Sequence, residues 1–218
     1  MNRKCSSCRL VNYTEAAKCA RCDADLLTVA NIETKQKITA AGIVVRAVVC
    51  LCVCLAVLFG FYLSLIASAK RLTLDEKEAV DRATAIVREK GFSTEAMLLD
   101  NFTAYRSNDN WLNASVAKES AYAATNFPFE IMTVYSDFFT YPTDDVERAA
   151  ILLHEARHLR GQNEHDAYAF VWKNRQKLGW TRDKYLYSPV WSNIRRQTKD
   201  NVPELFTCVD NELGDCTE

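Results

Sequence analysis

The chain has 218 residues, of which 49% are apolar and 25% are charged, so neither a disordered chain nor a fibrous repeat fits the composition. The formal net charge of -1 hides an asymmetry: residues 1–46 carry eight Lys or Arg against four Asp or Glu, residues 47–69 carry no charge, and residues 70–218 carry nineteen against twenty-four. Because the large carboxyl-terminal part is acidic, a dedicated nucleic-acid binder is not expected.

Residues 1–30 contain two C-x-x-C pairs, Cys5 with Cys8 and Cys19 with Cys22, separated by ten residues. Each pair can form one turn around a metal, and together the four thiolates can surround a tetrahedral zinc ion. We therefore predict a four-cysteine zinc finger with one structural Zn²⁺ over residues 1–30, followed by a linker over residues 31–46.

The stretch CSSCRLVNYTEAAKCARC resembles the four-cysteine zinc finger of the Ran-binding-protein type, because Asn12 lies four residues after Cys8 and seven before Cys19, where that family keeps an asparagine. The resemblance implies the fold of that finger. Arg3 replaces the family's tryptophan, and Arg9-Leu10 replaces the Thr-Phe pair with which some members bind ubiquitin. Binding of ubiquitin or RNA is therefore not expected.

Residues 47–69 (AVVCLCVCLAVLFGFYLSLIASA) form an uncharged apolar segment. At 1.5 Å per residue, a helix of this length covers roughly 30 Å of hydrocarbon. A core helix seldom has so long an apolar run, and the 46 residues that precede the segment argue against a cleaved signal peptide. We predict one transmembrane helix over residues 47–69, and hence a single-pass membrane protein.

The charges beside this segment do not decide its orientation, because three Lys or Arg residues flank it closely on each side. The cysteines do. Four zinc-bound thiolates need a reducing compartment, so we expect the amino terminus in the cytoplasm. Cys208 and Cys216 enclose a short loop rich in turn residues, and we expect them to form a disulfide in an oxidising, extracytoplasmic compartment.

Residues 70–218 form the predicted extracytoplasmic domain and are numerous enough to bury a core. Thr73 and Glu76 make a capping-box pattern at the start of a helix that ends at Gly91. The aromatic and β-branched run 127–139 predicts a strand. Three more helices are predicted, one from residues 142–144 to Gly161, one from about residue 164 to 178, and one opened by Ser188-Pro189. Residues 93–126 receive no assignment.

The helix that ends at Gly161 carries the motif His154-Glu155-Ala156-Arg157-His158. Histidines at positions i and i+4 share one helical face, so both imidazoles can bind one Zn²⁺. Glu155 lies beside them without being needed as a ligand, and it can take a proton from a zinc-activated water and return it to the leaving amine. The motif predicts a catalytic zinc site in which Glu155 is the catalytic base.

The motif and its flanks resemble the zincin metallopeptidases, in which an edge strand lies beside the active-site helix. Here the run FEIMTVY precedes the helix as the corresponding strand. The resemblance implies an α+β, zincin-like domain with its HExxH helix beside a small sheet. It also implies zinc ligation by His154 and His158, with Glu155 as general base.

Several residues after the motif can supply the third zinc ligand. Gly161 and Glu164 take the places of the glycine and the last histidine in the HExxHxxGxxH pattern of metzincins, but no methionine follows to form the methionine turn of that family. The stretch EHDA, which begins at Glu164, is also similar to the E-x-x-A helix of zincins with a glutamate ligand. We favour Glu164, then His165, with Asp166 or Glu204 as further alternatives.

Tyr168, one helical turn beyond Glu164, is the predicted donor of a hydrogen bond to the oxyanion of the reaction, with Tyr185 and Tyr187 as equal rivals. The predicted function is zinc-dependent peptide-bond hydrolysis by a membrane-anchored metallopeptidase, a hydrolase whose peptide or protein substrate lies on the extracytoplasmic side. The alternative is a non-enzymatic membrane adaptor, in which the finger binds a cytoplasmic protein and the HExxH domain is structural or inactive. Glu155 favours the enzyme, because a structural zinc site needs no base and prefers four protein ligands.

Overall fold

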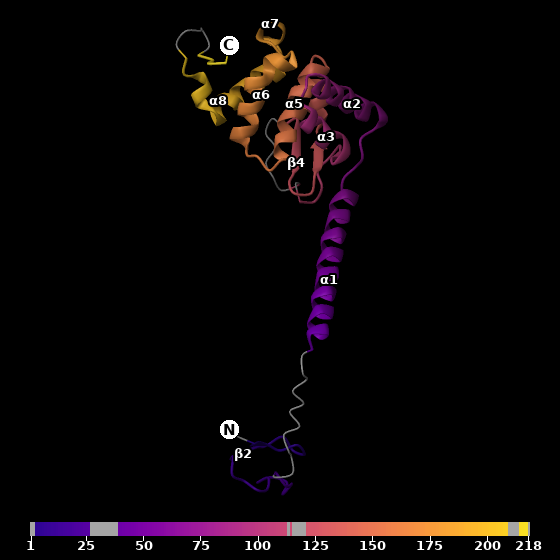
Figure 1. Cartoon of the computed structure of the whole chain (residues 1–218), viewed down its shortest axis with the longest axis vertical. Coiled ribbons are helices and arrows are strands. Elements are labelled where there is room, and N and C mark those ends of the chain that lie inside the picture. The colour runs from indigo at the N-terminus through magenta and orange to yellow at the C-terminus, as the bar shows by residue number, and fades with distance from the viewer. Residues whose placement is uncertain (1–2, 27–38, 113, 115–120, 209–213, 218) are drawn as a thin grey trace. The chain divides into compact units, whose positions relative to one another are not determined.

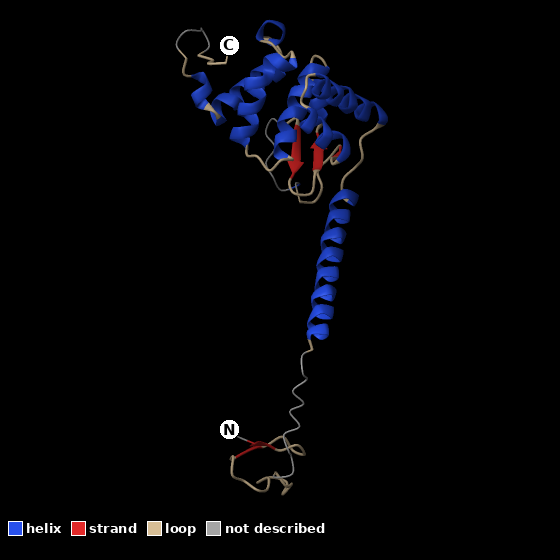
Figure 2. Ribbon diagram, viewed as in Figure 1, coloured by secondary structure: helices blue, strands red, loops and turns tan. Residues whose placement is uncertain are grey.

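The computed structural model of the chain describes residues 3–26, 39–112, 114, 121–208 and 214–217. It divides into two compact units, Met1–Val53 and Cys54–Glu218, which are described in turn. The described residues combine helices with two small sheets, so the fold is mixed, as the sequence predicts (Figure 2).

The amino-terminal unit contains two similar turns, each formed around one C-x-x-C pair. The backbone N–H of the first cysteine of each pair, Cys5 or Cys19, donates to the carbonyl five residues later at 2.9 Å. The residue before that carbonyl, Arg9 or Asp23, has a positive φ of about 60° (60° and 59°) that closes the turn. The two C-x-x-C pairs therefore form the same type of turn. Residues 27–30 of the predicted finger lie outside the described residues.

Short antiparallel pairings support both turns. β1 (Arg3–Lys4) pairs with β2 (Val11–Asn12) next to the first turn, and Lys18 forms an isolated bridge with Asp25 next to the second. The only apolar side chain buried here besides the cysteines, among the described residues, is Leu26. A unit with so little buried apolar surface depends on something other than a hydrophobic core.

The predicted apolar helix is α1 (Ala40–Ala67), which is 28 residues long and apolar enough to cross a membrane. It begins seven residues before the predicted start at Ala47, because residues 40–46 continue the apolar pattern with Arg46 as the only charge in the helix. The predicted linker 31–46 is therefore too long at its carboxyl end, and its residues 31–38 lie outside the described part of the chain.

The helices predicted from capping signals are present in the carboxyl-terminal unit. They are α2 (Leu74–Glu89), α5 (Asp145–His158), α6 (Glu164–Leu178) and α8 (Pro189–Asn201). Thr73 and Glu76 form both hydrogen bonds of the capping box, and the side chains of Asp144 and Ser188 cap α5 and α8. These bonds join residues close in sequence, which is why the sequence reveals them.

The unassigned residues 93–126 supply three elements: α3 (Ser93–Asn101), β3 (Ala104–Arg106) and β4 (Ala123–Asn126). β5 (Ile131–Val134) lies between them in a sheet of order β3-β5-β4, parallel to β3 and antiparallel to β4. The strand predicted over 127–139 is thus wrong over most of its length. A turn with a cis Phe127–Pro128 bond precedes β5, and α4 (Ser136–Thr140) follows it.

The predicted edge strand also needs correction. The run FEIMTVY contains β5, which is the central strand, whereas the edge strand that packs against α5 is β4. The aromatic residues that suggested a longer strand have another cause, because Phe138 of α4 is fully buried in the core. Aromatic composition reflected burial here rather than extended backbone.

α5 is the central element of this unit and packs against α2, α3, α6 and β4 (Figure 1). α6 and α8 pack on one another, and the buried rings of Trp172, Trp180 and Trp191 contact each other there; α7 (Arg182–Tyr185) lies between these helices in sequence. A 3-10 helix (Pro203–Phe206) follows α8. Cys208 and Cys216 then form the predicted disulfide, with their Cα atoms 5.1 Å apart.

Candidate functional site

The four cysteines of the amino-terminal unit converge on one point. Their sulfur atoms all lie within 4.8 Å of one another, with Cys5 and Cys22 3.6 Å apart and Cys8 and Cys19 3.4 Å apart. Sulfurs at the corners of a tetrahedron with Zn–S bonds of 2.3 Å are about 3.8 Å apart. This four-cysteine group can therefore hold one metal ion, and its donor set and spacing fit zinc.

Asn12 links the two cysteine turns. Its amide nitrogen donates to the Leu10 carbonyl at 3.0 Å and lies 3.6 Å from the Cys19 sulfur, while its oxygen accepts from the Ala20 N–H at 3.1 Å. Backbone N–H groups of Arg21 and Cys22, opposed by burial, lower the pKa of Cys19 to about 6. The fold thus favours the thiolate at Cys19, the protonation state in which cysteine binds zinc, whereas the neighbouring Cys8 and Cys5 sulfurs help to raise the pKa of Cys22.

A second group of metal-binding side chains lies in the carboxyl-terminal unit and consists of His154, His158 and Glu164. The two Nε2 atoms are 3.0 Å apart, and the Glu164 carboxylate oxygens lie 3.2 Å from His154 Nε2 and 3.4 Å from His158 Nε2. Nitrogen and oxygen ligands bound to tetrahedral zinc at 2.0–2.1 Å are about 3.3 Å apart. The two short contacts of Glu164 involve different oxygens, Oε2 for His154 and Oε1 for His158, and one donor atom from each of the three residues lies within 4.8 Å of the others, so the group can hold one small cation.

The turn between α5 and α6 brings Glu164 to the histidines. Gly161 has a φ of 73°, its N–H donates to the His158 carbonyl at 2.8 Å, and the Gln162 N–H donates to the Arg157 carbonyl at 3.1 Å. This is a Schellman motif, which reverses the chain at the end of a helix. Asn163 then caps α6 through its side chain, so Glu164 is the first residue of the next helix.

The same turn orients one of the imidazoles. His158 Nδ1 lies 2.8 Å from the Gln162 carbonyl, which can only accept, so Nδ1 carries a proton and Nε2 faces Glu164. His154 is held differently: its buried Nδ1 has no hydrogen-bond partner among the described residues, and its ring packs on Tyr168 with centroids 4.3 Å apart. Both rings therefore direct Nε2 towards the group.

The charges of the group raise and lower the pKa values of its members. Burial opposes protonation of His158, but contact with Glu164, the charge of Glu155 and the Gln162 carbonyl together raise its pKa to about 9. The two histidines hold the pKa of Glu164 well below its usual range. Without a metal, the group therefore keeps a proton that a cation has to displace.

Glu155 is 6% exposed, and its Oε2 atom accepts a hydrogen bond of 2.7 Å from Thr125 of β4. Together with His154 and Glu164 it lines a cleft of about 560 Å³. The other walls come from the start of β4 and from the last two turns of α8. A buried carboxylate thus faces the same cavity as two of the metal-binding side chains.

Of the three candidate tyrosines, Tyr168 is the one that lines this cleft. Its hydroxyl donates to the Gln197 side chain of α8, and burial raises its pKa well above the ordinary value. The Tyr185 hydroxyl donates to Asp144 at the amino-terminal end of α5, 2.8 Å away, and Tyr187 is 96% exposed on the surface. The structure therefore brings Tyr168, and neither rival, to the candidate site.

The alternatives to Glu164 lie apart from the histidine pair. His165 Nε2 is 2.8 Å from the Glu204 carboxylate, and His165 Nδ1 is 3.3 Å from Asp166. These three side chains are exposed and form a separate surface cluster. Their contacts raise the pKa of His165, mainly through Glu204. Geometry thus places Glu164, rather than His165, Asp166 or Glu204, with His154 and His158.

Sequence reasoning missed the residues that support the group. Arg157, inside the motif, donates through Nη1 to Glu95 at 2.6 Å and through Nε to the Gln162 side chain. Glu95 lies on α3, is 5% exposed and also accepts from Arg160 at 3.0 Å. Because Glu95 lies far from Arg157 in the sequence, no sequence pattern linked the two residues. The supporting role of Gln162 could have been predicted, because Gln162 directly follows the helix-ending Gly161.

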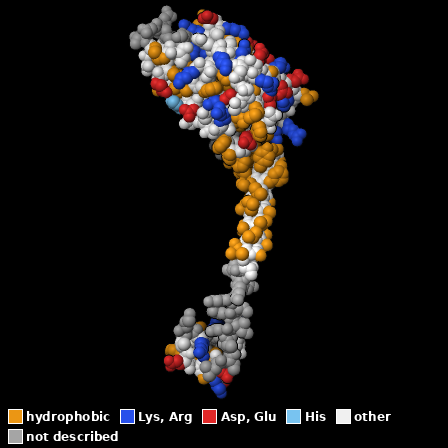
Figure 3. Space-filling model, viewed as in Figure 1, with side chains coloured by type: hydrophobic (Ala, Val, Ile, Leu, Met, Phe, Trp, Pro, Cys, Tyr) orange, Lys and Arg blue, Asp and Glu red, His pale blue; other side chains and the backbone are white. Residues whose placement is uncertain are grey.

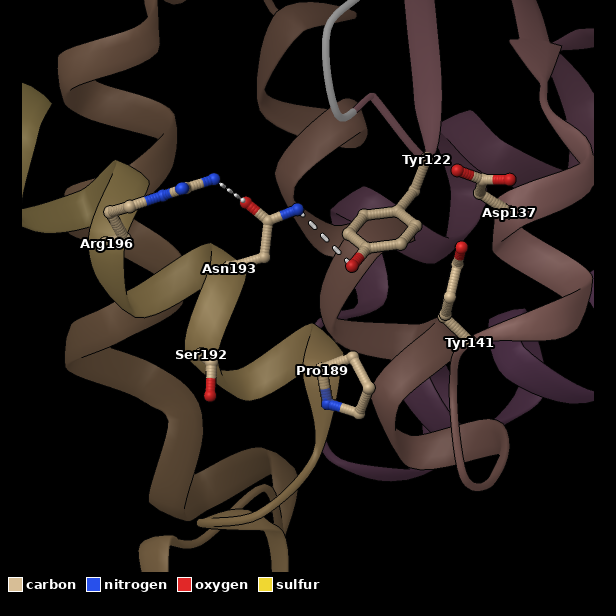
Figure 4. A pocket seen from close by; sticks show the side chains of 7 residues that line it. All are labelled: Tyr122, Asp137, Tyr141, Pro189, Ser192, Asn193 and Arg196. Atoms are coloured by element: carbon tan, nitrogen blue, oxygen red, sulfur yellow. Dashed lines mark hydrogen bonds between the residues drawn. The ribbon is translucent and has the colours of Figure 1, made fainter.

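A second hollow, of about 470 Å³, adjoins the cleft and shares Tyr122 and Arg196 with it. Asn193 lies between these two residues: it donates to the Tyr122 hydroxyl at 3.3 Å and accepts from Arg196 at 3.3 Å (Figure 4). Gln197, the partner of Tyr168, donates to the same Asn193 oxygen at 2.8 Å. One polar network on α8 thus runs from the second hollow to the candidate metal site.

Comparison with protein-family models, with curated proteins and with solved structures found no match for this chain. What the two groups can do is therefore argued from their own chemistry and geometry.

Proposed function

We propose that the carboxyl-terminal unit is a zinc metallopeptidase of the zincin type, anchored in a membrane by α1. The observation that carries this proposal is the convergence of His154, His158 and Glu164 at an open cleft, where one donor atom from each residue lies within 4.8 Å of the other two. Structural zinc sites use four protein ligands, whereas catalytic sites use three and keep a position open. A three-ligand group beside a buried Glu155 supports catalysis.

In this proposal the side chains of the site divide the work. A zinc ion held by the three ligands supplies Lewis-acid polarisation and lowers the pKa of water to about 7. Glu155, held through Oε2 by Thr125, takes the proton of the attacking water and passes it to the leaving amine. Tyr168 can stabilise the oxyanion once its hydroxyl exchanges Gln197 for the substrate oxygen.

The shape of the surface beside the site supports an extended substrate. The cleft and the second hollow share Tyr122 and Arg196, so a chain lying across the metal group can continue into the second hollow. That hollow is lined by the polar side chains of Tyr122, Ser192 and Asn193 and carries opposite charges on Arg196 and Asp137. A peptide or protein segment matches such a groove better than a small molecule does.

Two substitutions test the proposal together. His158→Ala removes an imidazole ligand and is expected to strip the metal and the stability that the metal lends. Glu155→Gln keeps the size and all three ligands, so zinc should remain bound, but the amide cannot accept a proton and the rate should fall about 10²–10⁴-fold. Zinc content and hydrolysis of a peptide mixture are measured on the same preparations.

The outcomes separate enzyme from adaptor. Zinc retained with activity lost in Glu155→Gln supports the peptidase. A Glu155→Gln variant that cleaves as fast as the parent contradicts the mechanism, and a parent protein that binds zinc without hydrolysing any peptide supports the non-enzymatic adaptor instead.

We further propose that the zinc finger before α1 is cytoplasmic and binds a protein partner there, and that the peptidase domain after α1 is extracytoplasmic. The support is chemical, since a four-cysteine group needs reduced thiols and the Cys208–Cys216 disulfide needs an oxidising compartment. A membrane-impermeant thiol reagent applied to intact cells should miss the four finger cysteines and should label Cys208 and Cys216 only after reduction. Labelling of the finger cysteines from outside would invert this topology.

A further inference from the structure

α1 is longer than a bilayer requires. Its 28 residues extend about 42 Å at 1.5 Å per residue, whereas the hydrocarbon core of a bilayer is about 30 Å thick. The last turns of the helix are packed against the folded part of the same unit. Leu65 is fully buried there, and the Phe61 ring meets the rings of Trp111 and Phe129 at centroid distances of 5.3 and 5.2 Å.

Hydrogen bonds fasten the loop after β3 to the end of α1. Trp111 donates through its backbone N–H to Ser68 Oγ and through its indole N–H to Ser64 Oγ, both at 3.3 Å. Arg106, which is largely buried, donates through Nε to the Ile66 carbonyl at 3.3 Å. Both serines belong to the uncharged segment 47–69, so this loop reaches the helix within its apolar part rather than beyond it.

An apolar surface surrounds this junction. We call it the apolar rim, and it consists of Phe61, Trp111, Leu112, Phe127 and Phe129. Trp111 is 50% exposed, Leu112 38% and Phe127 58%. Figure 3 shows hydrophobic side chains gathered along α1 and at the end of the folded domain that α1 enters. Clustered exposed aromatic side chains mark interaction surfaces, and Trp is enriched where a bilayer meets water.

We propose that the apolar rim lies in the interfacial layer of the same bilayer that α1 spans, so that the catalytic unit rests on the membrane. Lipid is the occupant that the structure favours, because the rim is continuous with a helix whose own apolar surface needs lipid around it. Lys70 and Arg71 directly follow the uncharged segment 47–69, at the position where cationic side chains contact lipid headgroups. This inference uses the proposed membrane span.

The rim also adjoins the candidate metal group. A Cβ atom on Gly161 would lie 3.5 Å from the Phe127 ring, so the rim contacts the turn between α5 and α6. Gln162, in the same turn, orients His158 through its carbonyl. A unit resting on its rim therefore holds the metal group close to the lipid surface. If the proposed peptidase activity holds, the substrate class is peptide segments presented at the membrane surface, such as the stretch next to a transmembrane helix.

Tryptophan fluorescence of the full chain in lipid vesicles tests the rim. The chain has four Trp residues, and the three besides Trp111 are at most 2% exposed in the core. In phosphatidylcholine vesicles brominated near the headgroup end of the acyl chains, we expect strong quenching in the parent protein. Trp111→Phe should remove most of that quenching, since the buried rings stay distant from lipid. Quenching that is absent in the parent, or unchanged in Trp111→Phe, overturns the proposal.

Two matched reporters in the Trp111→Phe background sharpen the test. Phe127→Trp places an indole on the rim and should restore quenching. Tyr187→Trp places an indole at a 96% exposed position just after α7. Because α7 lies at the opposite end of the unit from α1 (Figure 1), this indole should stay unquenched. Equal quenching of the two reporters contradicts the proposal.

These measurements need neither zinc nor hydrolysis, so a failed rim is distinct from a failed peptidase. Flotation with the vesicles separately reports whether α1 inserts. A chain that floats but shows no rim quenching refutes the resting position alone.

Discussion

The two candidate metal groups of this chain are built in opposite ways. In the amino-terminal unit, all four ligands come from 18 consecutive residues, Cys5 to Cys22, and each pair sits on its own local turn. In the carboxyl-terminal unit, two ligands lie on α5 and the third begins α6, while the supporting residues come from α3 and β4.

The difference teaches what each group is suited to do. Four thiolates complete a tetrahedron, so a metal held there has no room for a substrate and serves the fold. Two imidazoles and a carboxylate leave a coordination position open, which is useful only if a separate core holds the three ligands in place. That core exists around α5, whereas Leu26 is the one apolar side chain, besides cysteines, buried in the described part of the finger.

The largest effect that this comparison predicts is the response to chelation. A peptide of residues 1–30 should be unfolded without zinc and folded with it, because metal binding contributes about 10–16 kcal/mol in such sites. The full chain should keep the helical circular dichroism of its larger unit under the same chelator. If NMR shows that the peptide is folded without zinc, the two regions do not differ in how far their folding depends on a metal.

The next effect concerns the buried support of the second group. Glu95→Ala leaves Arg157 buried without its carboxylate, and loss of one partner of a buried ion pair costs about 3–5 kcal/mol in the free energy of unfolding. Urea unfolding of the chain monitored at the larger unit measures this. Glu89→Ala, at an exposed position on α2, is the matched control and should change stability by less than about 0.5 kcal/mol. Equal effects would show that the ion pair contributes nothing.

A smaller effect distinguishes the third ligand. Glu164→Ala removes a side chain that binds the metal directly. Zinc binding should therefore weaken by more than the roughly 100-fold that loss of a group supporting a ligand costs. His165→Ala removes a side chain that pairs with Glu204 on the surface, so zinc affinity should be unchanged. Titration with zinc in a competing chelator measures both. The reverse result would move the third ligand to His165.

The smallest effect is the dependence of zinc affinity on pH. The metal-free group holds a proton on His158, whose pKa is raised to about 9, and zinc has to displace it. Affinity should therefore rise about tenfold per pH unit up to that pKa. The metal-free fold should show the opposite trend: since the pKa is raised above its unfolded value of about 6.5, the stability from protonated His158 is complete below that value and is lost as pH rises through 9. Calorimetry in buffers of different ionisation enthalpy detects the released proton.

The sequence alone determined the features that depend on neighbouring residues. The two C-x-x-C pairs, the apolar segment and the histidines at i and i+4 are visible as spacing. The starts of α2, α5 and α8 follow from capping signals, and the carboxyl ends of α2, α5 and α6 follow from helix-ending glycines. Each of these is settled by hydrogen bonds or side-chain positions within a few residues, so no knowledge of the rest of the chain is needed.

Tertiary structure alone decided the features that join distant residues. The choice of Glu164 over His165 depends on which way the chain leaves Gly161, and the roles of Thr125 and Glu95 depend on contacts 30 and 62 residues away from Glu155 and Arg157. The strand over 127–139 failed for the same reason, because aromatic residues serve burial as well as extended backbone and the sequence does not say which. Packing of α1 against Trp111 and Phe129 likewise joins segments far apart in the chain, and only the folded core brings them together.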